Sequence, residues 1–261
     1  MKKRVISLLQ MDIKTADPSH NLDRAAKLFE KAAQRRSEFI CLPEMWSTGF
    51  AYDDLPAISK TWHKETIGFL TGWAKRSGAW VFGGSIPEND GGKVYNTSFV
   101  FDPSGKQIGA YRKIHIFSPT GEHEHFDHGR KMPVFEAGGA ITASEICYDI
   151  RFPELSRKYW EKGAKLVFVP AQFPSKRVDH WLTLLKARAI ENHCFMAGCN
   201  RIGRDRIYEY PGESVIYDPF GKIIEKASHR EEVLTAQIDL STVDEANKRI
   251  PIEKDRRPEV Y

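Results

Sequence analysis

Extended apolar runs alternate with amphipathic segments along this chain, which predicts an α/β protein with helices packed on the faces of its sheets. A second observation is a repeated turn. Asp-Pro-X-Gly-Lys joins two extended runs in VYNTSFVFDPSGKQIGAYRK and again in SVIYDPFGKIIEKAS. Proline presets such a turn and glycine closes it, so each copy predicts a hairpin and makes the sheets mixed. The repeat also indicates that the two halves of the chain are related.

In the first half, a buried strand is followed by an amphipathic helix, with Asp17 and Pro18 as its cap and start. The expected strands lie at 4–12, 38–44 and 80–88. The expected helices lie at 18–36 and 67–76. The doublet Gly83-Gly84 within the third extended run predicts a bend or a close approach of two backbone segments.

The second half repeats the alternation, with Pro153 in the first turn of a helix. Its expected strands lie at 140–147, 165–172, 195–202 and 231–240. Its expected helices lie at 153–162 and 178–191 and begin again near 241. Sites in α/β folds collect at the carboxyl ends of strands. Glu44, Lys113 and Cys147 each follow an extended run, so we expect them to converge on one rim.

Composition excludes several classes of protein. The chain has 261 residues, 41% hydrophobic and 28% charged, which suits a globular domain with a sizeable core. The net charge of +4 is scattered, which disfavours a nucleic-acid partner. No apolar run approaches the roughly 20 residues that span a bilayer, and the first run is shorter than a secretory core. Four cysteines without CxxC spacing indicate a reducing compartment, and we expect a cytoplasmic protein.

Cys147 is the candidate nucleophile. It ends a strand and precedes the helix start at Pro153, where free backbone N–H groups and the helix dipole favour a thiolate. Cysteine more often acts as a small apolar residue, and that interpretation suits Cys41, Cys194 and Cys199, which lie within apolar strands. A nucleophilic thiol needs a base, for which histidine is the usual candidate.

The histidine-rich stretch GEHEHFDHG contains His123, His125 and His128. Alternating histidines can bind a metal, so a metal-dependent hydrolase is an alternative hypothesis. The stretch lacks an HExxH pattern or a Cys/His pair that would fix the ligand geometry, and a polar loop of this kind is usually solvated. We therefore expect no metal there.

A carboxylate is the other candidate base. Glu44 follows an apolar strand beside Trp46 and Phe50, where desolvation would raise its pKa towards neutrality. Lys113 ends the second arm of the first hairpin and, if turned into a pocket, would supply a fixed positive charge for a developing oxyanion. Taken singly, each residue also fits an ordinary charged side chain at a strand end.

The ordered segments LPEMWSTGF, YRKIHIF and SEICYDIRFPEL resemble the nitrilase superfamily of carbon–nitrogen hydrolases. The likeness extends from the first strand to the closing KDRRPEVY, so we expect one carbon–nitrogen hydrolase domain over 1–261. The resemblance implies a four-layer α-β-β-α sandwich with two pseudo-symmetric halves, assembled as a homodimer or a larger homo-oligomer. It implies a small-molecule amide as substrate and no metal or organic cofactor.

The resemblance also implies roles for particular residues. The family's Glu-Lys-Cys triad falls on Glu44, Lys113 and Cys147, with a thioester on the cysteine and with the backbone N–H of Tyr148 as a second oxyanion donor. The family has another active-site glutamate after the lysine, for which TGEHEHFDHG offers Glu122 or Glu124. Glu122 is preferred, because its place before HEHFDHG is similar to that in omega-amidase-like members.

The segments ICYDIRFPE and KARAIENHCFMAGCNRIG resemble the omega-amidase branch, which hydrolyses the terminal amide of 2-oxo dicarboxylic monoamides such as 2-oxoglutaramate or 2-oxosuccinamate. Deaminated-glutathione amidases and N-carbamoyl amino-acid hydrolases remain alternatives within the superfamily. A noncatalytic binding or scaffold protein that keeps this fold is an alternative from another functional class. A carboxylated substrate requires a cation in the pocket. Arg151 is the arginine nearest the nucleophile, but a buried ion pair that fixes the nucleophile turn is the favoured interpretation for it.

The remaining pocket candidates are wall residues, each of which also fits a place in the core. They are Trp46, Phe117, Gln172 and Phe173.

Overall fold

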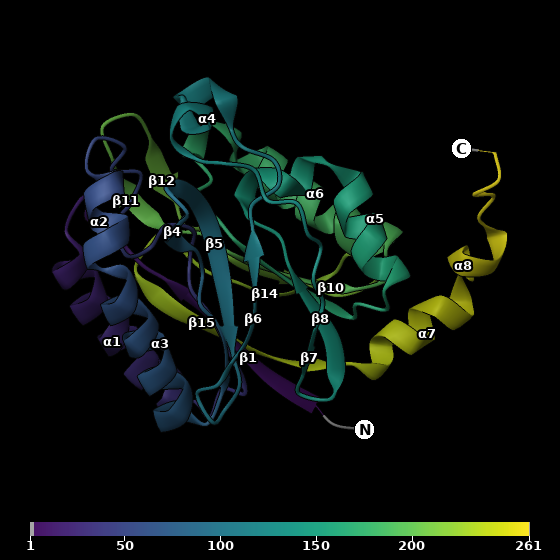
Figure 1. Cartoon of the computed structure of the whole chain (residues 1–261). Coiled ribbons are helices and arrows are strands. Elements are labelled where there is room, and N and C mark those ends of the chain that lie inside the picture. The colour runs from purple at the N-terminus through teal and green to yellow at the C-terminus, as the bar shows by residue number, and fades with distance from the viewer. Residues whose placement is uncertain (1–2, 261) are drawn as a thin grey trace.

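Two β-sheets lie face to face in the computed structural model, which describes residues 3–260, and helices cover the outer side of each sheet (Figure 1). Residues 1, 2 and 261, which fall within the domain expected over 1–261, lie outside the described residues. Within 3–260, the first sheet has seven strands: β1 (Lys3–Gln10), β2 (Phe39–Cys41), β3 (Trp80–Phe82), β4 (Ile86–Asp90), β5 (Lys93–Phe101), β6 (Gln107–Arg112) and β15 (Glu232–Asp239). The second sheet, counted over the same residues, has six: β7 (Phe135–Ala137), β8 (Ala140–Ser144), β9 (Leu166–Pro170), β10 (Phe195–Cys199), β13 (Val215–Tyr217) and β14 (Ile223–Lys226). A separate hairpin pairs β11 (Ile202–Arg204) with β12 (Glu209–Pro211).

The two halves of the chain share one strand and helix pattern. Parallel neighbours need a crossover connection, usually a helix. In the first half, α1 (Pro18–Gln34) and α3 (His63–Ser77) connect the parallel strands β1, β2 and β3. In the second half, α5 (Pro153–Glu161) and α6 (Val178–Glu191) connect the parallel strands β8, β9 and β10. The flanking strands pair antiparallel, so both sheets are mixed, as the sequence predicts.

The layers are held together by two kinds of apolar contact. Between the sheets, Phe82 of β3 and Phe168 of β9 stack with their ring centroids 3.9 Å apart. On the outer side of the first sheet, Phe29 of α1 stacks on Trp73 of α3 at 5.1 Å. Trp181 of α6 is buried in the corresponding cluster outside the second sheet. The predicted four-layer α-β-β-α sandwich is confirmed.

Both predicted hairpins are present and have the same turn. Asp102 Oδ1, between β5 and β6, accepts hydrogen bonds from the backbone N–H groups two and four residues further on, at 2.8 and 3.0 Å. Asp218 Oδ1, between β13 and β14, accepts from the equivalent two groups, both at 2.9 Å. Gly105 and Gly221 follow with φ of 80° and 74°, which glycine tolerates without strain. The repeated motif thus makes the same local structure in each half.

The region around Gly84 differs from the expected single run at 80–88. The chain bends there, with φ of 61°, and β3 ends before β4 begins. A Cβ on Gly84 would lie 2.2 Å from the carbonyl oxygen of Pro43, so the close backbone approach predicted for the doublet is present. The helix expected at 67–76 begins earlier, at His63, and the sequence analysis missed α2 (Leu55–Thr61) just before it.

The short helices lie at the margins of the sandwich. They are α4 (Glu122–His125), α7 (Ser241–Arg249) and α8 (Ile252–Asp255), with the 3₁₀ turns η1 (Ser118–Thr120), η2 (Cys147–Arg151) and η3 (Ser175–Arg177). α7 and α8 extend away from the body (Figure 1). In residues 3–260, no helix combines the length and the apolar character that a bilayer span requires.

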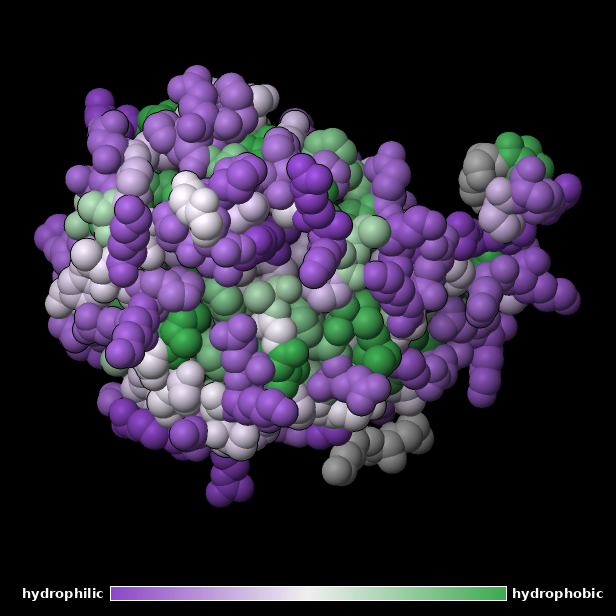
Figure 2. Space-filling view, viewed as in Figure 1, coloured by the Kyte–Doolittle hydropathy of each residue, from purple (hydrophilic) through white to green (hydrophobic). Residues whose placement is uncertain are grey.

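The open edges of the two sheets approach each other at β6 and β7. Gly109 of β6 lies against the ring of Phe135, and a Cβ on this glycine would fall 2.5 Å from a ring carbon. Figure 2 shows apolar atoms over β6 and β8 on this face, with hydrophilic side chains around them. The site described below lies at another end of the sheets, where several strands finish.

Candidate active site

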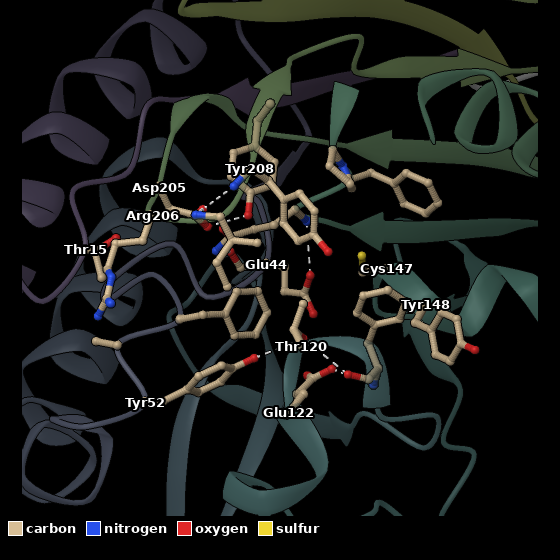
Figure 3. A pocket seen from close by; sticks show the side chains of 18 of the residues that line it. Thr15, Glu44, Tyr52, Thr120, Glu122, Cys147, Tyr148, Asp205, Arg206 and Tyr208 are labelled. Atoms are coloured by element: carbon tan, nitrogen blue, oxygen red, sulfur yellow. Dashed lines mark hydrogen bonds between the residues drawn. The ribbon is translucent and has the colours of Figure 1, made fainter. Parts of the chain in front are cut away.

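The residues expected to converge line one cavity of about 550 Å³. Glu44 follows β2, Lys113 follows β6 and Cys147 follows β8, and all three reach the cavity (Figure 3). Glu122 of α4 lines it as well. The prediction that these side chains meet at the ends of strands is therefore confirmed.

Three charged side chains form the base of this cavity. Lys113 Nζ donates to Glu44 Oε1 at 2.8 Å and to both carboxylate oxygens of Glu122, at 2.9 and 3.0 Å. Each of these side chains is only 1% exposed. Asn96 Nδ2 donates to the same two carboxylates, at 2.9 Å to Glu44 and 3.3 Å to Glu122. Removing such charges from water is costly, so the arrangement depends on these hydrogen bonds.

The pKa values of Glu44 and Lys113 shift upwards. Burial raises the pKa of Glu44, Lys113 opposes that rise, and Glu122 adds to it. Burial alone would lower the pKa of Lys113, but Glu122 and Glu44 outweigh it and hold that pKa well above its usual value. Lys113 is thus a permanent cation, and Glu44 is a carboxyl whose raised pKa makes it a better proton acceptor than an ordinary glutamate.

Cys147 occupies a strained turn at the start of η2, with φ of 47°. Few residues other than glycine adopt this conformation, and such strain often occurs at functional sites. Its thiol lies near the carboxylate of Glu44 and the backbone N–H of Gln172, which itself donates to Glu44 Oε2 at 3.0 Å. Burial and the Glu44 carboxylate raise the pKa of the thiol, against the effects of Lys113 and Gln172. The thiol therefore keeps its proton in the resting site, because burial and the adjacent carboxylate both disfavour a second anion.

The nucleophile turn is fixed by Asp149 rather than by Arg151. Asp149 is fully buried, and its Oδ2 accepts from the backbone N–H of Ile146 at 2.9 Å and from the hydroxyl of Tyr111 at 2.7 Å. Its Oδ1 accepts from the backbone N–H of His115 at 3.0 Å and lies 2.7 Å from the Nδ1 of the same residue. The carboxylate thereby joins the turn to the end of β6, next to the lysine.

Arg151 makes no ion pair among residues 3–260, so the expected buried pair is absent from the described chain. Its Nη2 lies 3.1 Å from His180 Nδ1, and its guanidinium lies over the ring of Phe173 and lines the cavity. The interpretation of Arg151 as the residue that fixes the turn is wrong, because Asp149 supplies that restraint.

Two glutamates were candidates in the histidine-rich stretch, and only one of them faces the lysine. Glu122 is buried and also accepts a hydrogen bond from the backbone N–H of Phe117 at 2.7 Å. The side chain of Glu124 is 68% exposed, on the outside of the same short helix. Geometry therefore puts Glu122, and not Glu124, beside Lys113.

The three histidines of that stretch do not converge. His125 stacks on Tyr52 at 4.4 Å and lines the cavity, so it belongs to the pocket wall. His128 Nδ1 lies 2.8 Å from the carbonyl oxygen of Ile114, and His123 is exposed. Among residues 3–260, no three His, Cys, Asp or Glu side chains are placed to share a metal ion.

Comparisons with known proteins identify the family. The family model described as carbon–nitrogen hydrolase matches residues 5–248. The chain belongs to the carbon–nitrogen hydrolase family. It is 38% identical over 259 residues to the 2-oxoglutaramate amidase of Bacillus subtilis (strain 168), covering 99% of this chain and 100% of the relative. It is 36% identical over 271 residues to the omega-amidase NIT2 of Xenopus tropicalis, covering 100% and 98%.

Solved structures agree with this assignment. Saccharomyces cerevisiae Nit3, a member of branch 10 of the nitrilase superfamily, superposes with a TM-score of 0.91 at 30% identity and covers 98% of this chain and 97% of its own. XC1258 from Xanthomonas campestris, a CN-hydrolase superfamily protein, gives 0.92 at 31% identity with 98% of both chains covered. The resemblance to the nitrilase superfamily and its omega-amidase-like branch is confirmed, and the protein is a hydrolase of carbon–nitrogen bonds.

The expected wall residues of this carbon–nitrogen hydrolase divide into two groups. Phe117, Gln172 and Phe173 line the cavity. Both polar atoms of the Gln172 side-chain amide are hydrogen-bonded. Its Nε2 donates to the Glu44 carbonyl at 2.9 Å, and its Oε1 accepts from Arg201 at 3.1 Å.

Trp46 was expected in the pocket wall but is absent from it. Its ring is fully buried in the cluster between the first sheet and its helices. Its Nε1 donates to the carbonyl oxygen of Gly83 at 2.8 Å, which fixes the bend between β3 and β4. The expectation is wrong because a strand-end aromatic ring can turn to either side of the sheet.

The sequence analysis missed several wall residues on loops, 3₁₀ turns and the short strand β12. They are Phe50, Tyr52, Thr120, Arg177, Tyr208 and Tyr210. In the view of Figure 3, Tyr208 lies above Glu44 and Tyr52 lies below it, so the wall is aromatic on two sides of the base. The density of Tyr and Phe in these loops was the available signal.

Proposed function

We propose that this hydrolase is a cysteine-dependent amidase of the omega-amidase type. Its substrate would be a small carboxylated monoamide, 2-oxoglutaramate or 2-oxosuccinamate, converted to the 2-oxo acid and ammonia. The observation that carries the proposal is the buried pair of Lys113 Nζ and Glu44 Oε1, 2.8 Å apart, in the cavity that Cys147 also lines. The names of the similar Bacillus and Xenopus enzymes support this substrate class.

In the proposed first half-reaction, Glu44 accepts the thiol proton as the sulfur of Cys147 attacks the amide carbon. The raised pKa of Glu44 supports this step, because a more basic carboxylate takes the proton more readily. The negative charge that forms on the carbonyl oxygen is stabilised by the Lys113 ammonium and by the backbone N–H of Tyr148. Each such donor contributes about 3 to 4 kcal/mol in other enzymes.

The carbon–nitrogen bond then breaks, and Glu44 returns its proton to the departing ammonia. A thioester with Cys147 remains. Water, deprotonated by Glu44, adds to the thioester carbon, and the sulfur leaves and regains a proton as the acid is released. One carboxyl thus moves a proton in each direction, and no metal or organic cofactor takes part in the proposed steps.

Glu122 is proposed to act through Lys113. It accepts two hydrogen bonds from the ammonium and one from the backbone of Phe117, which holds the lysine between the two carboxylates. It also helps to keep Lys113 charged. Glu122 is therefore a positioning residue that does not bond to the substrate.

Ammonia release from a panel of amides tests the proposal. The panel contains 2-oxoglutaramate, 2-oxosuccinamate, an amide of deaminated glutathione and an N-carbamoyl amino acid. We expect the two 2-oxo monoamides to have the highest kcat/KM, Cys147→Ala to abolish release, and EDTA to leave it unchanged. A wild-type enzyme that is inert on all four, or that loses activity to EDTA and regains it with zinc, would contradict the proposal.

A further inference from the structure

Three arginines line the cavity, Arg151, Arg177 and Arg206, and none of them forms an ion pair within residues 3–260. The half-buried Arg177, at the end of η3, lines the cavity, and its guanidinium lies over the rings of Phe117, at 5.4 Å, and Tyr208, at 5.6 Å. Throughout residues 3–260, no side chain forms an ion pair or a hydrogen bond with it. Lys113, by contrast, is already held by two carboxylates.

The aromatic contacts orient Arg177 without using its hydrogen-bonding groups. A guanidinium stacks on a ring through its face, which leaves the N–H groups at its edge free. Those groups form a planar fork that matches a carboxylate in a bidentate pair. Arg177 is therefore held in place while its side-chain N–H groups form no hydrogen bond within residues 3–260, as expected for a residue that binds an anion.

The loop that carries Tyr208 is itself fixed. Asp205 Oδ1 accepts from the backbone N–H groups of Ile207 and Tyr208, both at 2.7 Å, and its Oδ2 accepts from the hydroxyl of Tyr210 at 2.5 Å. These bonds occupy the Asp205 carboxylate, although it also lines the cavity. One wall of the Arg177 pocket is thus set before any ligand binds.

A row of contacts connects Arg177 with the nucleophile. The ring of Phe117 meets the ring of Tyr148, the residue after Cys147, with centroids 5.0 Å apart. The backbone N–H of Phe117 donates to Glu122, the partner of Lys113. The ring of Phe117 therefore lies between the Arg177 guanidinium and Tyr148, the residue that follows the nucleophile.

The distribution of charge favours the same wall. Asp53 and Asp54 line the cavity on the side of α2. Arg151 and Arg177 line it on the side of η2 and η3. A substrate anion will avoid the acidic side and turn to the basic one. Arg206 also lines the cavity, but it is exposed and follows Asp205 in the chain. Arg151 already contacts His180 at 3.1 Å. Among residues 3–260, Arg177 is therefore the half-buried arginine of this cavity whose side-chain donors form no hydrogen bond.

We propose that Arg177 binds the carboxylate of the substrate, between Phe117 and Tyr208, and so selects monoamides of short dicarboxylic acids over neutral amides. This inference rests on the proposed function, with the amide carbon at Cys147 and the carboxylate at Arg177. Arg177 is a specificity-determining residue and takes no part in the proton transfers.

The test compares two substrates, 2-oxoglutaramate and the uncharged pentanamide, in wild type and variants. Arg177→Gln should lower kcat/KM for 2-oxoglutaramate by about 100-fold, mostly through KM, and change that for pentanamide by less than about threefold. Arg177→Lys keeps the charge but loses the fork, so it should cost about tenfold. Arg76→Gln is the matched control, because Arg76 also lies over an aromatic ring, Trp73, but outside the cavity.

Binding to Cys147→Ala enzyme separates this inference from the proposed function. Calorimetry with 2-oxoglutarate should show an affinity about 100-fold weaker after Arg177→Gln is added, whether or not the wild type turns over any amide. A weaker affinity without turnover in the wild type would support the anion site and reject the amidase. An unchanged ratio of the two substrates, unchanged or undetectable 2-oxoglutarate binding, or a selective loss with Arg151→Gln instead, would overturn the inference. Thermal unfolding of each variant checks its fold.

Discussion

The positive side chains at the bottom of the cavity and in its outer wall are held by different kinds of contact. At the base, Lys113 is 1% exposed and satisfied by Glu44 and Glu122 before any ligand arrives. In the wall, Arg177 is partly exposed and, within residues 3–260, held by rings alone. With the proposed roles, the charge for the reaction is positioned in advance, whereas the charge for recognition is left for the ligand to neutralise.

The largest expected effect comes from removing the central cation. Lys113→Met leaves two buried carboxylates without their partner, so we expect the free energy of unfolding to fall by about 3 to 5 kcal/mol. Loss of an oxyanion donor should also lower kcat by at least about 100-fold. Denaturant unfolding and steady-state kinetics measure the two effects.

The double variant Lys113→Met/Glu122→Gln serves as the control, since it removes one of the two stranded carboxylates. It should recover part of the stability and none of the activity. Equal stability of the single and double variants would show that the three charges do not form one unit.

The two candidate glutamates offer a matched comparison. Glu122→Gln removes a charged acceptor from Lys113 and should lower kcat by about 10- to 100-fold, as expected for losing a hydrogen bond of about 1.5 to 3 kcal/mol to a charged group. Glu124→Gln changes an exposed residue and should leave kcat within about twofold. The reverse ranking would reject the assignment of Glu122.

Substitution of Asp149 tests whether the charged side chains at the bottom of the cavity depend on the hydrogen bonds that fix the nucleophile turn. Asp149→Asn keeps the shape but presents an amide NH₂ to groups that donate to the carboxylate. Each buried donor left unpaired costs about 1 to 3 kcal/mol, so we expect a loss of stability and a lower kcat. KM should change little, because the side chain does not line the cavity. A KM effect that exceeds the kcat effect would contradict a positioning role.

The pH dependence of activity follows from Glu44. Its pKa is raised, and the proposed base must be ionised in the free enzyme. We therefore expect kcat/KM to fall as the pH decreases through this pKa, with the midpoint above the 4.5 of an ordinary glutamate. A midpoint at or below 4.5, measured with a substrate that does not titrate there, would contradict the role of Glu44.

The last prediction concerns stability alone, with no expected change in activity, and involves Glu145, a buried carboxyl without a lysine like Lys113. Its Oε1 accepts from Ser156 at 2.5 Å, and its Oε2 has no partner among the described residues. Burial raises its pKa from 4.5 to about 8. Between these values the folded state binds more protons than the unfolded state, so stability should decline as pH rises, by up to about 1.4 kcal/mol per pH unit.

Glu145→Gln should remove that slope and leave a more stable protein than the wild type at pH 9. Chemical denaturation at several pH values measures the difference. A wild-type curve that is flat from pH 5 to 8, or a variant with the same slope, would show that Glu145 does not titrate in this range.

Local patterns predicted the α/β layers with mixed sheets and the strand-end residues at the base of the cavity, whereas the four-layer sandwich was implied by the resemblance to the nitrilase superfamily. Strand and helix periods repeat in each half, and Glu44, Lys113 and Cys147 occupy the ends of extended runs, where the fold class brings them together. A strand end is a position that periodicity identifies without knowledge of distant contacts.

The outer wall was not predictable in the same way. Arg177 lies beside Phe117 and Tyr208, which belong to two other loops, so its environment depends on contacts between distant parts of the chain. Trp46 is a second example, because its ring is held in the core by a hydrogen bond to Gly83, which lies in the bend between β3 and β4. Loop conformation and side-chain direction therefore need the folded structure.

The account depends most on Cys147 as the atom that bonds to the substrate. Rapid mixing with 2-oxoglutaramate, acid quenching and mass spectrometry of the digested protein measures this directly. We expect a transient acyl adduct on the peptide that contains Cys147, with Cys41, Cys194 and Cys199 unmodified as internal controls. Turnover of the amide with no adduct at any quench time, together with full activity in Cys147→Ala, would contradict the account.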